Sequence, residues 1–155
     1  MARPAGIVGG LVLAGLLALG LATLMGRGPR SVSAIPQPPH VFFGIVTANG
    51  TPVAGAIKIE ARIDNVHYGR KAGGNQNTFT HGINASGYNY GSSESFQVCA
   101  DDVSSAGVEG GVDGDTIAFY VDGRRATTKQ GGTAVIVTFS TGSVERVDLD
   151  YDPAN

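Results

Sequence analysis

The chain has 155 residues, a net charge of −2 at pH 7, 24 glycines and no tryptophan. All 13 acidic residues but only eight of the 11 basic ones lie beyond residue 34, so residues 35–155 carry a net charge of −5. This acidic balance, with no basic cluster larger than a pair, argues against nucleic-acid binding. Roughly 120 residues beyond residue 34 suffice for one domain with one core.

Residues 5–25 carry no charge and nothing more polar than Thr23. A helix of this length matches a hydrocarbon core about 30 Å thick, so we expect one hydrophobic helix here. Val32-Ser33-Ala34 has the small residues of a signal-peptide cleavage site, whereas the length of the apolar run favours a retained membrane anchor. The sequence therefore predicts export, with residues 1–34 as either a signal peptide cleaved near Ala34 or a signal anchor.

Residues 35–40 are rich in proline and predict an extended spacer. A β-strand is predicted over residues 40–48, which are rich in aromatic and β-branched residues, and Asn49-Gly50 supplies a turn. Apolar and charged residues then alternate over residues 56–63, which predicts a strand with one buried and one solvated face. Asp64-Asn65 turns the chain again.

Further strands are predicted at residues 95–100, 116–121, 133–140 and 144–151. Asp-Gly pairs bound the second of these strands, which is typical of a strand that enters a tight hairpin. In the last strand, aspartates alternate with apolar residues, as at a solvated sheet edge that discourages pairing with other molecules.

No segment beyond residue 35 has the apolar stripe of a helix. The sequence therefore predicts an all-β domain, a single antiparallel β-sandwich of about seven strands at residues 41–151, followed by a short tail at 152–155.

Several short motifs occur along residues 41–151. They are Phe43-Gly44-Ile45-Val46, Asn49-Gly50-Thr51-Pro52 with Gly55, Ser86-Gly87-Tyr88, Gly114-Asp115-Thr116-Ile117 with Asp122-Gly123, and the pair from Thr138 to Leu149. These motifs resemble those of carboxypeptidase-regulatory-like (transthyretin-like) domains, which are Ig-like sandwiches. The similarity implies an exported, non-catalytic module of the stalk, adhesion or accessory type, with no particular ligand. Residues 67–95 are longer and more polar than the family pattern.

Residues 67–95 hold the candidate binding residues Tyr68, Phe79, His81, Tyr88 and Tyr90, set among asparagines, glycines and serines. Flat aromatic faces with planar amides can bind sugars, and loops on a rigid scaffold often carry function. The alternative interpretation is a surface loop whose tyrosines cover one edge of the sandwich.

Calcium is the one cofactor the sequence suggests, at Asp101, Asp102, Asp113 and Asp115. Calcium prefers several carboxylate oxygens on loops. Aspartates also occur in turns for reasons of backbone geometry alone, and that alternative stays open.

Motifs for catalysis are missing: there is no Gly-x-Ser-x-Gly, no His-Glu-x-x-His and no phosphate-binding loop. His40, His67 and His81 lack metal-ligand spacing, and Cys99, the only cysteine, cannot form an intramolecular disulfide. We therefore expect a protein that is not an enzyme.

The expected function is that of an exported structural or interaction module at the cell surface, with a protein or glycan partner. Two alternatives remain. The chain could self-assemble into surface filaments by pairing edge strands, with the acidic last strand or the Pro-rich arm as donor. It could also be a carbohydrate-binding module that uses residues 67–95.

Overall fold

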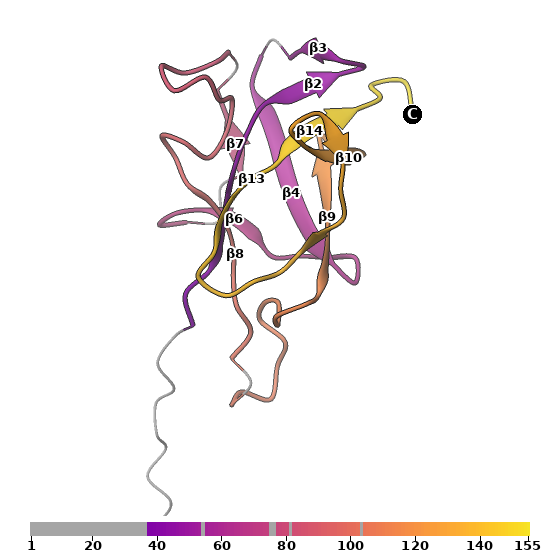
Figure 1. Ribbon diagram of the computed structural model, residues 1–155. Coiled ribbons are helices and arrows are strands. Elements are labelled where there is room, and N and C mark those ends of the chain that lie inside the picture. Colours follow the sequence, from indigo (N-terminus) through magenta and orange to yellow (C-terminus); the bar gives the residue numbers. More distant parts are fainter. Residues whose placement is uncertain (1–36, 54, 75–76, 81, 103) are drawn as a thin grey trace, which may run out of the picture. The chain divides into compact units, whose positions relative to one another are not determined.

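The computed structural model describes residues 37–53, 55–74, 77–80, 82–102 and 104–155. The predicted helix at residues 5–25 and the candidate residue His81 lie outside these ranges. The described residues belong to one compact unit, Ala34–Asn155, and form two β-sheets (Figure 1), which confirms the all-β prediction. No helix in the described part of the chain is long and apolar enough to cross a membrane.

The smaller sheet has four strands in the order β13–β1–β8–β6, and the larger sheet follows the order β3–β2–β14–β10–β9–β4–β5. Three short strands join the larger sheet at its sides, β7 on β4, β11 on β10 and β12 on β9. The bounds are β1 His40–Phe43, β2 Val46–Ala48, β3 Thr51–Pro52, β4 Ile57–Ile63, β5 Val66–His67, β6 Gly69–Lys71, β7 Thr78–Phe79, β8 Phe96–Val98, β9 Thr116–Val121, β10 Arg124–Gln130, β11 Thr133–Ala134, β12 Val137–Thr138, β13 Val144–Arg146 and β14 Asp148–Tyr151.

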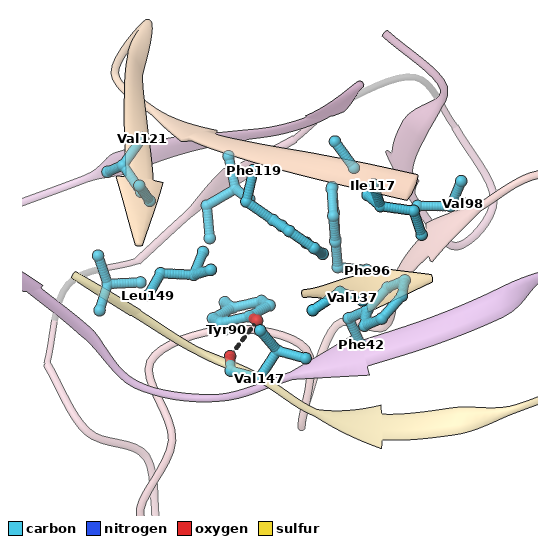
Figure 2. Packing of buried hydrophobic residues seen from close by; sticks show 14 of the residues in the cluster. Phe42, Tyr90, Phe96, Val98, Ile117, Phe119, Val121, Val137, Val147 and Leu149 are labelled. Atoms are coloured by element: carbon cyan, nitrogen blue, oxygen red, sulfur yellow. Dashed lines mark hydrogen bonds between the residues drawn. The ribbon is translucent and has the colours of Figure 1, made fainter. Parts of the chain in front are cut away.

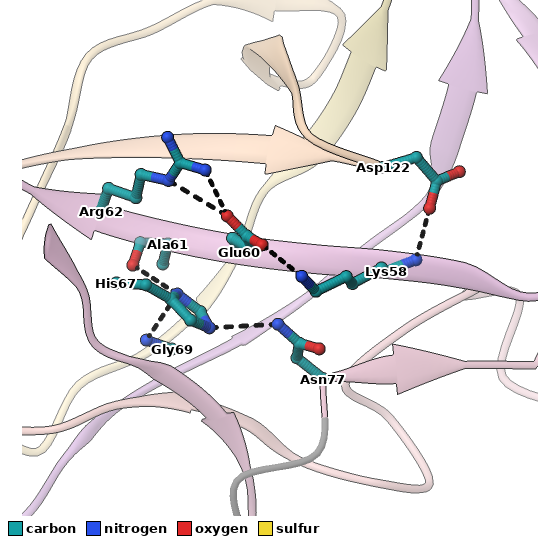
Figure 3. Close-up of polar contacts among 8 residues, drawn as sticks. All are labelled: Lys58, Glu60, Ala61, Arg62, His67, Gly69, Asn77 and Asp122. Carbon is teal, nitrogen blue, oxygen red and sulfur yellow. Dashed lines mark hydrogen bonds and ion pairs between the residues drawn. The ribbon is translucent and has the colours of Figure 1, made fainter. Parts of the chain in front are cut away.

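The predicted two-faced strand is present as β4, whose apolar residues all face the core. One charged residue departs from the prediction of a solvated face, because Glu60 is only 8% exposed. Lys58 and Arg62 flank its carboxylate at 2.6 and 2.5 Å (Figure 3), and hydrogen bonds from these two residues lower the pKa of Glu60 to about 2. Ion pairs along the strand therefore cover the polar face of β4 at this point.

Two of the predicted strands divide between the sheets. Residues 40–48 form β1 in the smaller sheet and β2 in the larger one, and residues 144–151 divide in the same way into β13 and β14. The two divided segments run side by side in parallel, β1 with β13 and β2 with β14. The prediction of a wholly antiparallel sandwich is wrong at these two pairings, and the described residues form fourteen short strands where about seven were expected.

Gly44 lies at the point where the chain passes from β1 to β2. The N–H of Val147 donates to the Phe43 carbonyl at 2.9 Å, and the N–H of Leu149 donates to the Ile45 carbonyl at 2.8 Å. A Cβ added at Gly44 would lie 2.2 Å from the Val147 carbonyl oxygen, a distance that no side chain tolerates. The two divided segments therefore approach each other closely only because residue 44 is glycine.

Sequence analysis identified the hairpin at Asp122-Gly123 but not β10, the strand that follows it. Asp122 and Gly123 have φ angles of 49° and 81°, the left-handed values of a type I′ turn, which confirms the predicted hairpin. β10 is polar, with Ala126 as its one buried residue, so hydrophobic alternation gives little sign of it. It nevertheless pairs with both β9 and β14, and is central to the larger sheet.

The aspartate-bearing half of the predicted last strand is not an edge. β14 lies between β2 and β10, so the prediction of a solvated edge is wrong for residues 148–151, whereas β13 lies at the edge of the smaller sheet. Lys129 of β10 pairs with Asp150 at 2.7 Å, and Thr47 and the Gly50 N–H also donate to that carboxylate. These bonds, the one from Lys129 above all, lower the pKa of Asp150 to about 2 and let an aspartate occupy an interior strand.

The core between the sheets combines 12 aliphatic residues with six aromatic ones, whose packing is shown in Figure 2. Phe96 makes edge or tilted contacts with Phe79, Tyr90 and Phe119, at centroid distances of 5.9 to 6.3 Å. Phe42 meets Phe119 edge-on at 5.2 Å. Aromatic pairs in these geometries stabilise a fold beyond the apolar area they bury, which suits a domain whose only cysteine is free.

Candidate functional site

Residues 67–95 are not one long surface loop. They contain β6 and β7, and residues 88–91 dock on the sandwich at Gly44. The Gly44 N–H donates to the Tyr90 carbonyl at 3.1 Å, and the Asn89 N–H donates to the Gly44 carbonyl at 2.9 Å. The segment is therefore held by the same glycine that lets the chain pass between the sheets.

Two of the predicted binding residues are core residues. Phe79 is 2% exposed and Tyr90 is 1% exposed. The Tyr90 hydroxyl donates to the Val147 carbonyl at 2.5 Å (Figure 2), and burial raises the pKa of Tyr90 well above its ordinary value. Their rings fill the sandwich and are not free to stack on a ligand.

The structure nevertheless brings three predicted residues to one cavity of about 450 Å³. Pockets that hold small molecules begin at about 300 Å³. The lining combines apolar and polar groups, and the described residues that form it are Phe79, Thr80, Gly82, Ile83, Asn84, Tyr88, Asn89, Tyr90, Ser93 and Glu94. We call this the 79–94 cavity.

Two asparagines fix the wall of the 79–94 cavity. Asn89 is 7% exposed, accepts a hydrogen bond from the Val46 N–H at 3.1 Å and donates to the Gly82 carbonyl at 3.2 Å. Asn84 accepts from the N–H groups of Ser86 and Tyr88 at 2.9 and 3.1 Å, which closes a tight turn. The two bonds that Asn84 accepts are of the kind by which asparagine replaces a backbone partner in turns.

The polar groups around the 79–94 cavity are hydroxyls, amides and one carboxylate. Thr80 and Ser93 supply hydroxyls, and the Glu94 carboxylate pairs with Lys71 of β6. The Arg146 guanidinium carbon lies over the Tyr88 ring, 5.0 Å from its centre, and Phe43 meets that ring edge-on at 5.0 Å. The cavity therefore offers hydrogen bonds rather than the open aromatic platform that sequence analysis anticipated.

Tyr68 lies at a different cavity, of about 400 Å³, with His67, Arg70, Cys99 and Glu109. Its ring packs partly against the core. Cys99 is half-buried there. The predicted binding residues are thus divided between two cavities. Tyr68 lies at this one, whereas Phe79, Tyr88 and Tyr90 line the 79–94 cavity.

His67 has both ring nitrogens occupied by protein groups (Figure 3). Nδ1 lies 3.0 Å from the Ala61 carbonyl and Nε2 lies 3.1 Å from the Asn77 amide nitrogen. The Gly69 N–H also donates to Nδ1, at 3.3 Å, so protein groups engage both nitrogens of the ring. His67 therefore ties β5 to β4 and to the segment before β7.

The four candidate calcium ligands each accept a hydrogen bond from a nearby backbone N–H. The donors are Glu109 to Asp101, Ser104 to Asp102, Thr141 to Asp113 and Val112 to Asp115, at 2.6 to 2.9 Å. The bonds from Ser104 and Thr141 lower the pKa values of Asp102 and Asp113. Among the described residues, no three His, Cys, Asp or Glu side chains form a group able to hold a metal ion.

Sequence analysis missed part of the 79–94 cavity, namely Thr80, Ile83, Ser93 and Glu94. Single hydroxyls and one carboxylate in a Gly/Ser-rich stretch carry no periodic signal that would mark them as a cavity wall.

Comparison of the chain with protein-family models, with curated proteins and with solved structures finds no match in any of the three.

Proposed function

We propose that this protein is an exported, non-catalytic β-sandwich module that binds a protein or glycan partner at the cell surface. The observation that carries the proposal is the 79–94 cavity, whose hydrogen-bonding wall is clamped to the sandwich through Asn89 and Tyr90. A cavity held by buried hydrogen bonds is preorganised, which reduces the entropy cost of binding.

Export is supported by the apolar segment 5–25, which is long enough to serve as a signal anchor and is followed by a site suited to cleavage near Ala34. We further propose that the domain is transthyretin-like. The motif Phe43-Gly44-Ile45-Val46 supports this kinship, because its glycine lies where the chain passes between the sheets.

The bonding of two histidines supports a role without catalysis. A general base needs a ring nitrogen that is free to take a proton. His67 engages Ala61 and Asn77 through its two nitrogens, and His40 accepts the Ser140 N–H through Nδ1 at 3.1 Å. Both side chains act as structural links in these positions.

A matched pair of substitutions tests the proposed cavity. Ile83 and Val108 are both exposed, at 54% and 71%, but only Ile83 lines the 79–94 cavity. We expect full-length chain on a glycan array to bind at least one glycan, Ile83→Glu to abolish the signal and Val108→Glu to keep it. A blank array would remove the glycan partner, and equal loss in both variants would remove the cavity.

Self-assembly remains a second candidate because β13 is an edge strand that carries Val144 at 69% exposure. Exposed apolar edges invite pairing, and a lysine placed on an edge suppresses it. Sedimentation of the full-length chain should then reveal oligomers that Val144→Lys dissociates. Monomers at every concentration would exclude assembly.

A further inference from the structure

A second cavity, of about 350 Å³, lies between β12 and β13 and shares no lining residue with the 79–94 cavity. Its polar wall consists of His40, Glu145 and the hydroxyl residues Thr138, Ser140 and Ser143. Two aliphatic residues, Ile136 and Val144, complete the lining, and both are among the most exposed hydrophobic residues of the described chain. We call it the His40 cavity.

The buried wall of this cavity holds a hydrogen-bond donor without a partner. His40 is 1% exposed, and its Nδ1 accepts the Ser140 N–H at 3.1 Å, so the proton of the neutral ring is on Nε2. Nε2 lies 3.2 Å from Oε2 of Glu145, an ion-pair distance, but among the described residues no group accepts a hydrogen bond from it. A buried donor in this state costs free energy that a ligand can recover.

The same geometry limits what can bind. A metal ion needs a lone pair, and Nε2 has none while it carries the proton. The negative charge of the Glu145 carboxylate disfavours an anionic ligand. The carboxylate of Asp113, on the adjacent loop, adds a second negative charge near His40 and has the same effect. An ammonium or guanidinium group could pair with Glu145 but has no lone pair to accept from Nε2–H, so a neutral ligand is left.

The spacing of the two groups points to a hydroxyl. With Nε2 and Oε2 only 3.2 Å apart, one ligand atom can meet both, and it must accept from Nε2–H and donate to the carboxylate. A hydroxyl oxygen does both, whereas the oxygen or nitrogen of an amide does one only. Ser143 donates to Ser140 at 2.9 Å, which leaves the Ser140 hydroxyl proton for a second ligand oxygen.

We infer that the His40 cavity binds a neutral polyhydroxy ligand, a saccharide or a cyclic polyol. One hydroxyl bridges His40 and Glu145, a second reaches Ser140, and the C–H face of the ring lies against Ile136 and Val144. This site is separate from the 79–94 cavity of the proposed function.

The test is a nuclear magnetic resonance titration of the isotope-labelled full-length chain in detergent micelles. The probes are methyl β-D-glucopyranoside and methyl α-D-mannopyranoside as saccharides, and myo-inositol as the polyol. We expect at least one of them to shift the His40 ring nitrogen and the Ile136 methyl resonances saturably, with a Kd on the order of 1 mM. The probe that binds tells the saccharide from the polyol.

Two variants sharpen the test. Glu145→Leu removes the acceptor and should weaken binding about tenfold or more, the effect of one hydrogen bond to a charged group. Ile136→Glu, at a site 81% exposed, should weaken it comparably without touching the core, and Val108→Glu, at a site 71% exposed outside both cavities, serves as the matched control that leaves it unchanged.

The inference is overturned if no probe gives a saturable shift at His40, or if Ile136→Glu and wild type respond alike. Failure of the proposed function is a separate outcome, because that function depends on Ile83 and not on Ile136.

Discussion

His40 links the two sheets from one fully buried position. Its ring lies 4.0 Å from Phe42 and 5.9 Å from Phe139, between centroids, while Nδ1 accepts a backbone N–H. Burial lowers the pKa of His40, although Glu145 and Asp113 act in the opposite direction. The folded protein therefore favours the neutral form of this histidine more than solvent does.

A pH dependence of stability follows. Because the pKa of His40 is lower in the folded state than in the unfolded state, its contribution to stability is present above about pH 6.5 and is lost as the pH falls. One pKa unit is worth about 1.4 kcal/mol, and 1 kcal/mol moves the melting temperature of a small domain by roughly 4–8 °C. Calorimetry between about pH 7 and pH 5 should find a steeper loss in wild type than in His40→Gln.

The two carboxylates with the most strongly lowered pKa values, Glu60 and Asp150, do not obscure this window. Glu60 and Asp150 have pKa values of about 2, so their contributions are present above about pH 4.5 and are lost only as the pH falls toward 2. Parallel melting curves for wild type and His40→Gln from pH 7 to pH 5 would contradict the account of His40.

At the scale of elements, the passage of two strands between the sheets at Gly44 is the feature on which the fold depends. Gly44→Ala should destabilise the domain by about 3 kcal/mol or more, because the added Cβ meets the Val147 carbonyl at 2.2 Å. Gly74→Ala is the matched control, since its Cβ would meet nothing within 4 Å, and it should change stability by about 0.5 kcal/mol or less. Denaturant unfolding measures both.

Comparable stability of the two glycine variants would mean that the strands do not approach closely at Gly44.

The close approach of the two segments at Gly44 was not predictable from the sequence. Residues 40–48 and 144–151 each read as one strand, because alternation reports which face is buried and not which sheet the partner belongs to. The two segments lie about one hundred residues apart in the chain, and packing between the sheets determines that they pair.

Turns were predictable for a local reason. Asn49-Gly50 and Asp64-Asn65 all take positive φ angles, between 49° and 77°, at the places where the sequence indicated turns. Only a few residue types readily adopt a positive φ angle, so such a turn can be predicted from the local residues alone. β10 lacked such a signal, since its residues alternate neither in polarity nor in size.

For the whole molecule, the sequence indicated which segment carries the candidate site but not how the segment is used. Aromatic residues in a polar stretch suggested a binding surface, yet Phe79 and Tyr90 turn inward and fill the core. Composition does not tell a buried ring from an exposed one when the segment is irregular. The asparagines that clamp the cavity wall looked like ordinary loop residues for the same reason.

The account rests on export, because a cell-surface partner is available only to an exported domain. The most direct measurement joins alkaline phosphatase, which matures only outside the reducing cytoplasm, to the C-terminus after Asn155. We predict an active fusion in the full-length chain and an inactive one when residues 5–25 are deleted. An intact full-length fusion without phosphatase activity would contradict the proposal.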